Sequence, residues 1–193
     1  MADFWGSLLV EYLEFYWDYS LWPRLQGLTD AEYLWEPVPG CWSVRQQADG
    51  TYQLDGEGGP EPDPPPVTTI AWRMMHIGAG CLYNRANAFF GDDGAPADAD
   101  MFDARFLPTS LPATADGAVA FMAEAYRRWH DGIAGLDEEA LRRPLGPRGA
   151  FFAKEPMAGL VLHISREVMH HGGEIGALRD LYRAGLGPGP DPG

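Results

Sequence analysis

Apolar residues recur at three- and four-residue spacing along four long segments of this chain, which is the pattern of amphipathic α-helices. The four predicted helices cover residues 4–26, 67–90, 114–136 and 156–184. No run of strands is evident between them. We therefore predict an all-α fold, a four-helix bundle with a short hairpin or loop excursion between its first and second helices.

Each predicted helix has one side that is expected to face the core. In the first helix, that side is mainly aromatic. Further aromatic residues lie elsewhere on the same helix. They favour either a wide buried surface or a contact between two copies of the chain. The last helix carries three arginines off its apolar side. The predicted core residues are Leu8, Tyr12, Phe15, Tyr19 and Trp22; Ile70, Met74, Ile77, Cys81 and Phe89; Val119, Met122, Tyr126, Trp129 and Ile133; and Leu160, Ile164, Ile175, Leu178 and Tyr182. The residues off these lines are Trp5, Tyr16 and Trp17, and Arg166, Arg179 and Arg183.

The segments between the helices carry turn and capping signals. Thr29 and Glu32 form a T-x-x-E capping box, and Asp49-Gly50 is a typical hairpin turn. Residues 91–111 form a long acidic linker, which is expected to run along the bundle or to cover one of its ends. We expect residues 1–186 to form a single domain and residues 187–193 a disordered tail.

Composition and charge exclude several classes of function. The chain has 193 residues, of which 46% are hydrophobic, and 28 acidic residues against 14 basic ones give a net charge of −14. This balance argues against a nucleic-acid partner and against an anionic membrane surface. No apolar run reaches the length that spans a bilayer, and the N-terminus lacks a basic signal region. With two cysteines and no C-x-x-C pattern, we expect a cytoplasmic protein whose thiols are reduced.

Polar residues interrupt the apolar side of the fourth helix. His163, Glu167 and His171 are spaced four residues apart and therefore line one side of it, and His76 lies among apolar residues of the second helix. Burying such groups costs several kcal/mol unless they are paired or bound to a metal. One interpretation is that these groups satisfy one another in the core; the other is a metal site assembled from two helices. His130, in the third helix, is expected to be solvated.

The order of the motifs resembles that of the DinB/YfiT-like metalloenzymes. The resemblance rests on three segments, Gly40-Cys41-Trp42-Ser43-Val44-Arg45, Trp72-Arg73-Met74-Met75-His76-Ile77, and residues 163–175. That family carries one histidine on the second helix and an H-x-x-x-H pair on the fourth. His76 and His171 match the first and last of these histidines, whereas Glu167 occupies the middle position.

The resemblance implies a divalent metal held by His76, Glu167 and His171. Zinc is expected first, with nickel or iron as alternatives, because two histidines and one carboxylate leave coordination positions open. His163, His170 and Glu174 are predicted to orient these ligands or to add one. The sequence contains no recognisable nucleophile motif, and it predicts no catalytic side chain.

The family implies an enzyme that uses a low-molecular-weight thiol as cosubstrate, an S-transferase or isomerase acting on a small molecule. A metal-dependent hydrolase is the first alternative, since a carboxylate ligand makes the ion less electrophilic than three imidazoles would. The second alternative is a non-enzymatic stress protein that binds metal or a small molecule. An open cavity over the metal would separate the enzymes from the second alternative. The aromatic first helix favours a homodimer.

Overall fold

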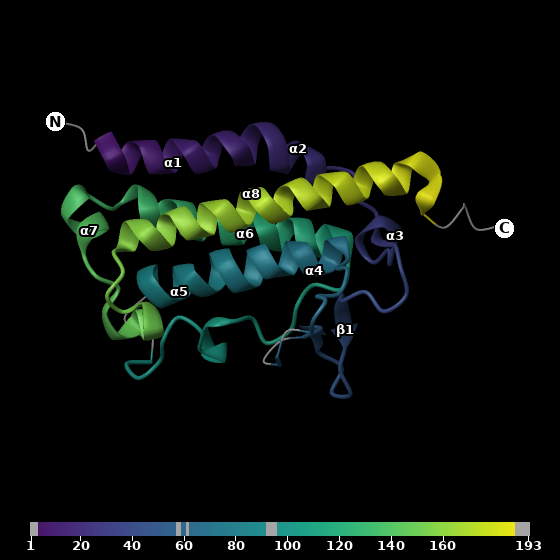
Figure 1. The fold of residues 1–193 in the computed structure, drawn as a ribbon, viewed down its shortest axis with the longest axis horizontal. Helices are drawn as coiled ribbons and strands as arrows, with labels where there is room; N and C mark the ends of the chain where they lie inside the picture. Colours follow the sequence, from purple (N-terminus) through teal and green to yellow (C-terminus); the bar gives the residue numbers. More distant parts are fainter. Residues whose placement is uncertain (1–3, 57–58, 61, 92–95, 188–193) are drawn as a thin grey trace.

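The computed structural model describes residues 4–56, 59–60, 62–91 and 96–187, and four long helices dominate it (Figure 1). Two of them consist of α-helical parts joined by π-helical turns, and the last one ends in such turns. The four helices are α1 (Phe4–Tyr16), Trp17–Leu21 and α2 (Trp22–Leu25); α4 (Ile70–Met75), His76–Tyr83 and α5 (Asn84–Phe90); α6 (Ala115–Ala134); and α8 (Met157–Leu181) with Tyr182–Leu186. The all-α bundle is confirmed. The predicted tail lies, apart from Gly187, outside the described residues.

The helices form a four-sided arrangement in which α6 and α8 each contact both α1 and α4. Helices α1 and α8 run in one direction, and α4, α5 and α6 run in the other (Figure 1). A long connection therefore returns from the end of α5 to the start of α6 along the bundle, through a 3₁₀ turn at Ala104–Phe106. At the other end, α7 (Glu138–Arg142) and the 3₁₀ segment Gly146–Phe152 join α6 to α8.

Side-chain caps begin several of these helices. Thr29 and Glu32 form the predicted reciprocal capping box before α3 (Asp30–Tyr33). Thr114 accepts a hydrogen bond from the backbone N–H of Gly117 at the start of α6. The caps satisfy N–H groups that have no partner within the helix.

The predicted hairpin lies between the first two long helices. Strands β1 (Val44–Gln46) and β2 (Tyr52–Leu54) are antiparallel, with Gln46 opposite Tyr52. The turn between them contains Gly50 at a φ of +87°, a conformation that favours glycine. This hairpin also receives the end of the long connection, because the N–H of Leu111 donates to the carbonyl oxygen of Tyr52.

Buried residues of all four long helices form one hydrophobic cluster. Most of the core residues predicted in the second, third and fourth helices are buried. Those at the margin, such as Phe89, Tyr126 and Tyr182, are half-buried.

The core-facing side predicted for the first helix was wrong. Four residues of the predicted line, Leu8, Tyr12, Phe15 and Tyr19, are exposed. The buried residues are Leu13, Trp17, Leu21 and Leu25. Both sets recur at helical spacing, so the helix has two apolar sides and periodicity alone does not choose between them. The aliphatic side, with Trp17, packs inward, and the larger aromatic side faces outward.

Arg179 was expected to lie off the apolar side of α8, yet it is 1% exposed. Its guanidinium lies 3.0 Å from the buried carboxylate of Glu32 and donates to backbone carbonyl oxygens at the end of α2. The pairing compensates the cost of burying both charges.

Within the described residues, no helix combines the length and apolarity that a membrane crossing requires.

Candidate metal centre

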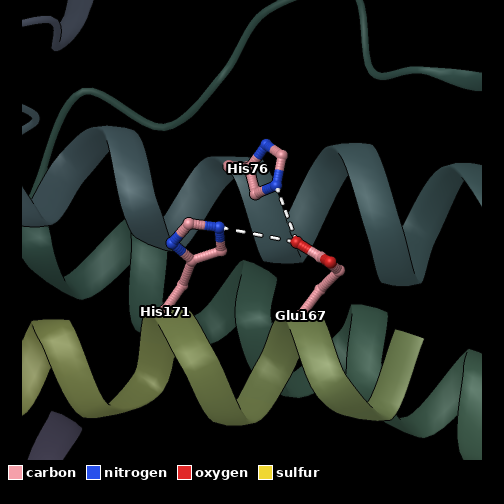
Figure 2. Close-up of side chains that lie close together, drawn as sticks. All are labelled: His76, Glu167 and His171. Carbon is pink, nitrogen blue, oxygen red and sulfur yellow. Dashed lines mark ion pairs between the residues drawn. The ribbon is translucent and has the colours of Figure 1, made fainter. Parts of the chain in front are cut away.

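The structure brings together the three residues that the sequence proposes as ligands (Figure 2). His76 begins the π-helical segment of the second helix, and Glu167 and His171 lie one turn apart on α8. The Nε2 atoms of both histidines are 3.6 Å from Oε2 of Glu167. The three atoms lie within 4.8 Å of one another, although they come from segments about ninety residues apart in sequence.

The position of His76 follows from how its helix begins. The backbone of Trp42 pairs with Val67 and Thr69, and the Thr69 hydroxyl donates to Ser43 Oγ and caps α4. One turn later the Trp72 ring stacks on the His76 imidazole, with centroids 4.9 Å apart and planes 6° from parallel. Trp42 and Ser43 thus hold the start of the second helix in place, and Trp72 holds the imidazole ring of His76.

The imidazole of His171 is oriented by a carboxylate behind it. Its Nδ1 lies 2.7 Å from Oε2 of Glu174, and the same oxygen accepts a 2.7 Å hydrogen bond from Nε of Arg73. Burial alone would raise the pKa of Glu174, but the hydrogen bonds from Arg73 and His171 lower it to about 2. A carboxylate on Nδ1 places the proton there and leaves the lone pair of Nε2 facing Glu167.

The electrostatics of the cluster suit a cation. Burial and the neighbouring His171 lower the pKa of His76 to about 4, against the opposing effect of Glu167. His76 is therefore neutral at pH 7, the state that binds a metal.

The distances within the trio also suit an ion. In a tetrahedral site, two ligand atoms that each lie about 2.0–2.1 Å from the ion are about 3.4 Å apart. The two 3.6 Å separations are close to that value, so the donor set fits the ion that the family implies.

The other three candidates stand outside this trio. Nδ1 of His163 accepts a 2.7 Å hydrogen bond from Arg166, and its side chain is 44% exposed. His170 is largely exposed and lies 3.7 Å from Glu174. His170, His171 and Glu174 form a second group compact enough for an ion, but Arg73 already pairs with Glu174 in that group. This favours the trio that includes His76.

Comparison with known sequences decides the family. The sequence model of the DinB superfamily matches residues 53–175, a range that includes α6 and the three residues of the trio. The chain belongs to the DinB superfamily. Neither a curated protein nor a solved structure matches the chain significantly.

A cavity of about 320 Å³ opens beside the trio of this DinB-superfamily protein. His76 and Glu167 form part of its wall, and the rest includes His163, Cys81, Asn84, Arg85 and Phe102. The aromatic residues Trp42, Tyr83 and Trp129 are not part of this wall. Burial raises the pKa of Cys81 to about 12, so its thiol is protonated at neutral pH.

Sequence reasoning missed Arg85 as a residue of the site because of the π-helical turns. At about 100° per residue, an α-helix would place Arg85 roughly opposite His76. The π-helical segment His76–Tyr83 contains more residues per turn and rotates the following side chains around the axis. Arg85 and His76 therefore line the same cavity, and no pattern at α-helical spacing reveals it.

His130 is not the solvated residue that was expected. Its Nε2 lies 2.6 Å from Glu14 of α1, and its side chain is 24% exposed. This pair links α6 to α1.

Proposed function

We propose that this DinB-superfamily protein is a metal-dependent enzyme that transfers a low-molecular-weight thiol to a small molecule or uses it in an isomerisation. His76, Glu167 and His171 would hold a divalent ion, zinc first. The observation that carries the proposal is the cavity, because it opens on the proposed ligands instead of being filled by core side chains. Its size is that of a pocket for a small metabolite.

The bound ion would supply one kind of chemistry, a lowered pKa for a thiol or water in contact with it. The chain's own residues prepare the site for this. Glu174 holds the proton of His171 on Nδ1, and Trp72 fixes the plane of His76 by stacking. The carboxylate of Glu167 would compensate one of the two positive charges of the ion, and the neutral His76 would compensate none.

Hydrolysis is the second candidate, and Glu167 is the observation that favours it. A carboxylate in the position of the family's middle histidine donates negative charge to the ion and makes it less electrophilic. Two histidines and one carboxylate also occur together in hydrolytic zinc sites. The same cavity would then admit water instead of a thiol.

The test compares both reactions on the same protein. Zinc-loaded protein is assayed for conjugation of glutathione or cysteine to monochlorobimane, and separately for hydrolysis of p-nitrophenyl acetate. We expect thiol conjugation that depends on zinc and is lost in His171→Ala. His130→Ala is the matched control, since His130 lies outside the site, and it should retain the activity.

Ester hydrolysis without thiol conjugation would favour the second candidate. Stoichiometric zinc binding with neither reaction would overturn the enzyme proposal and leave the alternative of a metal-binding protein without turnover.

A further inference from the structure

The cavity beside the trio contains a buried arginine that forms no ion pair with any described residue, and the charge of Asp100 acts on it only from a longer distance. Arg85 is 9% exposed and lines this cavity. Among the described residues, no carboxylate oxygen lies within 4.0 Å of its guanidinium, and only the carbonyl oxygen of Met101 accepts a hydrogen bond from it. Its Nε is buried without any partner. Buried arginines are normally paired, since an uncompensated buried charge is costly.

Neighbouring groups leave this guanidinium ready for a ligand. The ring of Phe102 covers one face, with its centroid 4.7 Å from Cζ. The side-chain amide oxygen of Asn84, in the same cavity wall, is also buried without a partner. The cavity wall thus offers the planar set of N–H donors of Arg85 and, beside it, the amide oxygen of Asn84, which accepts no hydrogen bond from a described residue. Such a pair matches a carboxylate with an adjacent hydroxyl or N–H group.

From this arrangement we propose that Arg85 and Asn84 bind the anionic end of the substrate, a small organic carboxylate, while its reacting end faces the metal trio. The inference rests on the proposed function for the reacting end, but the anion site itself needs no metal. Glu167, in the same wall, opposes an anion in the metal-free protein. A bound divalent ion would outweigh that charge, so carboxylate binding should be tighter in the zinc-loaded protein.

The test uses fluorine NMR with para-trifluoromethylbenzoate as the probe and its neutral amide, para-trifluoromethylbenzamide, as the reference. Binding is measured on the full chain in metal-free and zinc-loaded states. We expect the benzoate to bind at least about tenfold more tightly than the amide in both states, from the loss of charge-assisted hydrogen bonds. Equal binding of the two probes, or no benzoate binding up to about 10 mM, would overturn the inference.

Variants assign the effect to Arg85. Arg85→Gln should lose the preference for benzoate, and Arg85→Lys should retain part of it, because lysine keeps the charge without the planar set of donors. Arg142→Gln, at an exposed arginine of α7, is the matched control and should bind as the wild type does. Retained preference in Arg85→Gln would contradict the inference. If that variant fails to fold, the comparison of the two probes on wild-type protein still decides it.

The two proposals fail separately in these measurements. Zinc binding without preference for the benzoate removes the anion site and leaves the proposed function. A preference for the benzoate that depends on Arg85, in a protein that binds no zinc, removes the proposed function and leaves the anion site.

Discussion

Glu174 provides a sharp test of how the chain tunes the proposed metal site, because it contacts a proposed ligand without being one of the trio. Its Oε2 lies 2.7 Å from Nδ1 of His171 and 2.7 Å from Nε of Arg73. Substitution removes the acceptor that holds the proton of His171 on Nδ1. The imidazole can then adopt the other tautomer, which places a proton on Nε2, where the ion would bind.

The expected magnitude follows from this single contact. Loss of a carboxylate behind a ligating histidine typically costs 10–100-fold in metal affinity, or about 1.4–2.7 kcal/mol. Glu174→Gln keeps an oxygen that can accept from Nδ1, so we expect a loss of about tenfold. Glu174→Ala keeps no acceptor, and its loss should approach about a hundredfold. The larger loss of metal affinity in Glu174→Ala than in Glu174→Gln is as informative as the size of either loss.

Competition with a chromophoric zinc chelator measures these affinities directly. Glu139→Gln, on an 88% exposed glutamate of α7, is the control and should match the wild type. Zinc affinities of Glu174→Gln and Glu174→Ala within twofold of the wild type would refute the role of Glu174, provided that His171→Ala loses zinc in the same assay.

Two further predictions concern stability. Glu32→Ala leaves the 1% exposed Arg179 without its carboxylate partner and should lower the free energy of unfolding by about 3–5 kcal/mol in urea titrations, whereas Glu139→Ala should not. Burial lowers the pKa of His130, but hydrogen bonds with Glu14 and Asp131 outweigh it and raise the pKa above 6.5. The Glu14–His130 pair therefore stabilises the fold fully below pH 6.5, and this contribution disappears as the pH rises through the folded-state pKa. Glu14→Gln should destabilise the protein more at pH 6 than at pH 9; an equal effect at both would contradict this.

Much of the fold was predictable because its signals are local. Helical periodicity, the Thr29 capping box and the Asp49-Gly50 turn each depend on a few neighbouring residues, and the structure confirms all of them. The trio could also be predicted from the sequence, because His76, Glu167 and His171 are polar residues at positions where the helical pattern calls for apolar ones. The structure brings these three side chains together.

The failures have three physical causes. The first helix is apolar on two sides, so the choice between Leu13 and Tyr12 for the core depends on packing against α6 and α8. Arg85 was missed because π-helical turns change the angle between successive side chains, and the sequence pattern does not show where such turns occur. Pairs such as Glu32 with Arg179 depend on contacts between residues far apart in sequence, which no periodicity reports.

Elemental analysis of tag-free protein tests most directly whether His76, Glu167 and His171 bind one divalent ion. The wild type is measured beside Glu167→Ala, His171→Ala and the control His130→Ala. We expect close to one equivalent of zinc, nickel or iron in the wild type and in the control, and loss of the metal in both site variants. A wild type without metal after reconstitution, or equal metal content in all four proteins, would contradict this expectation.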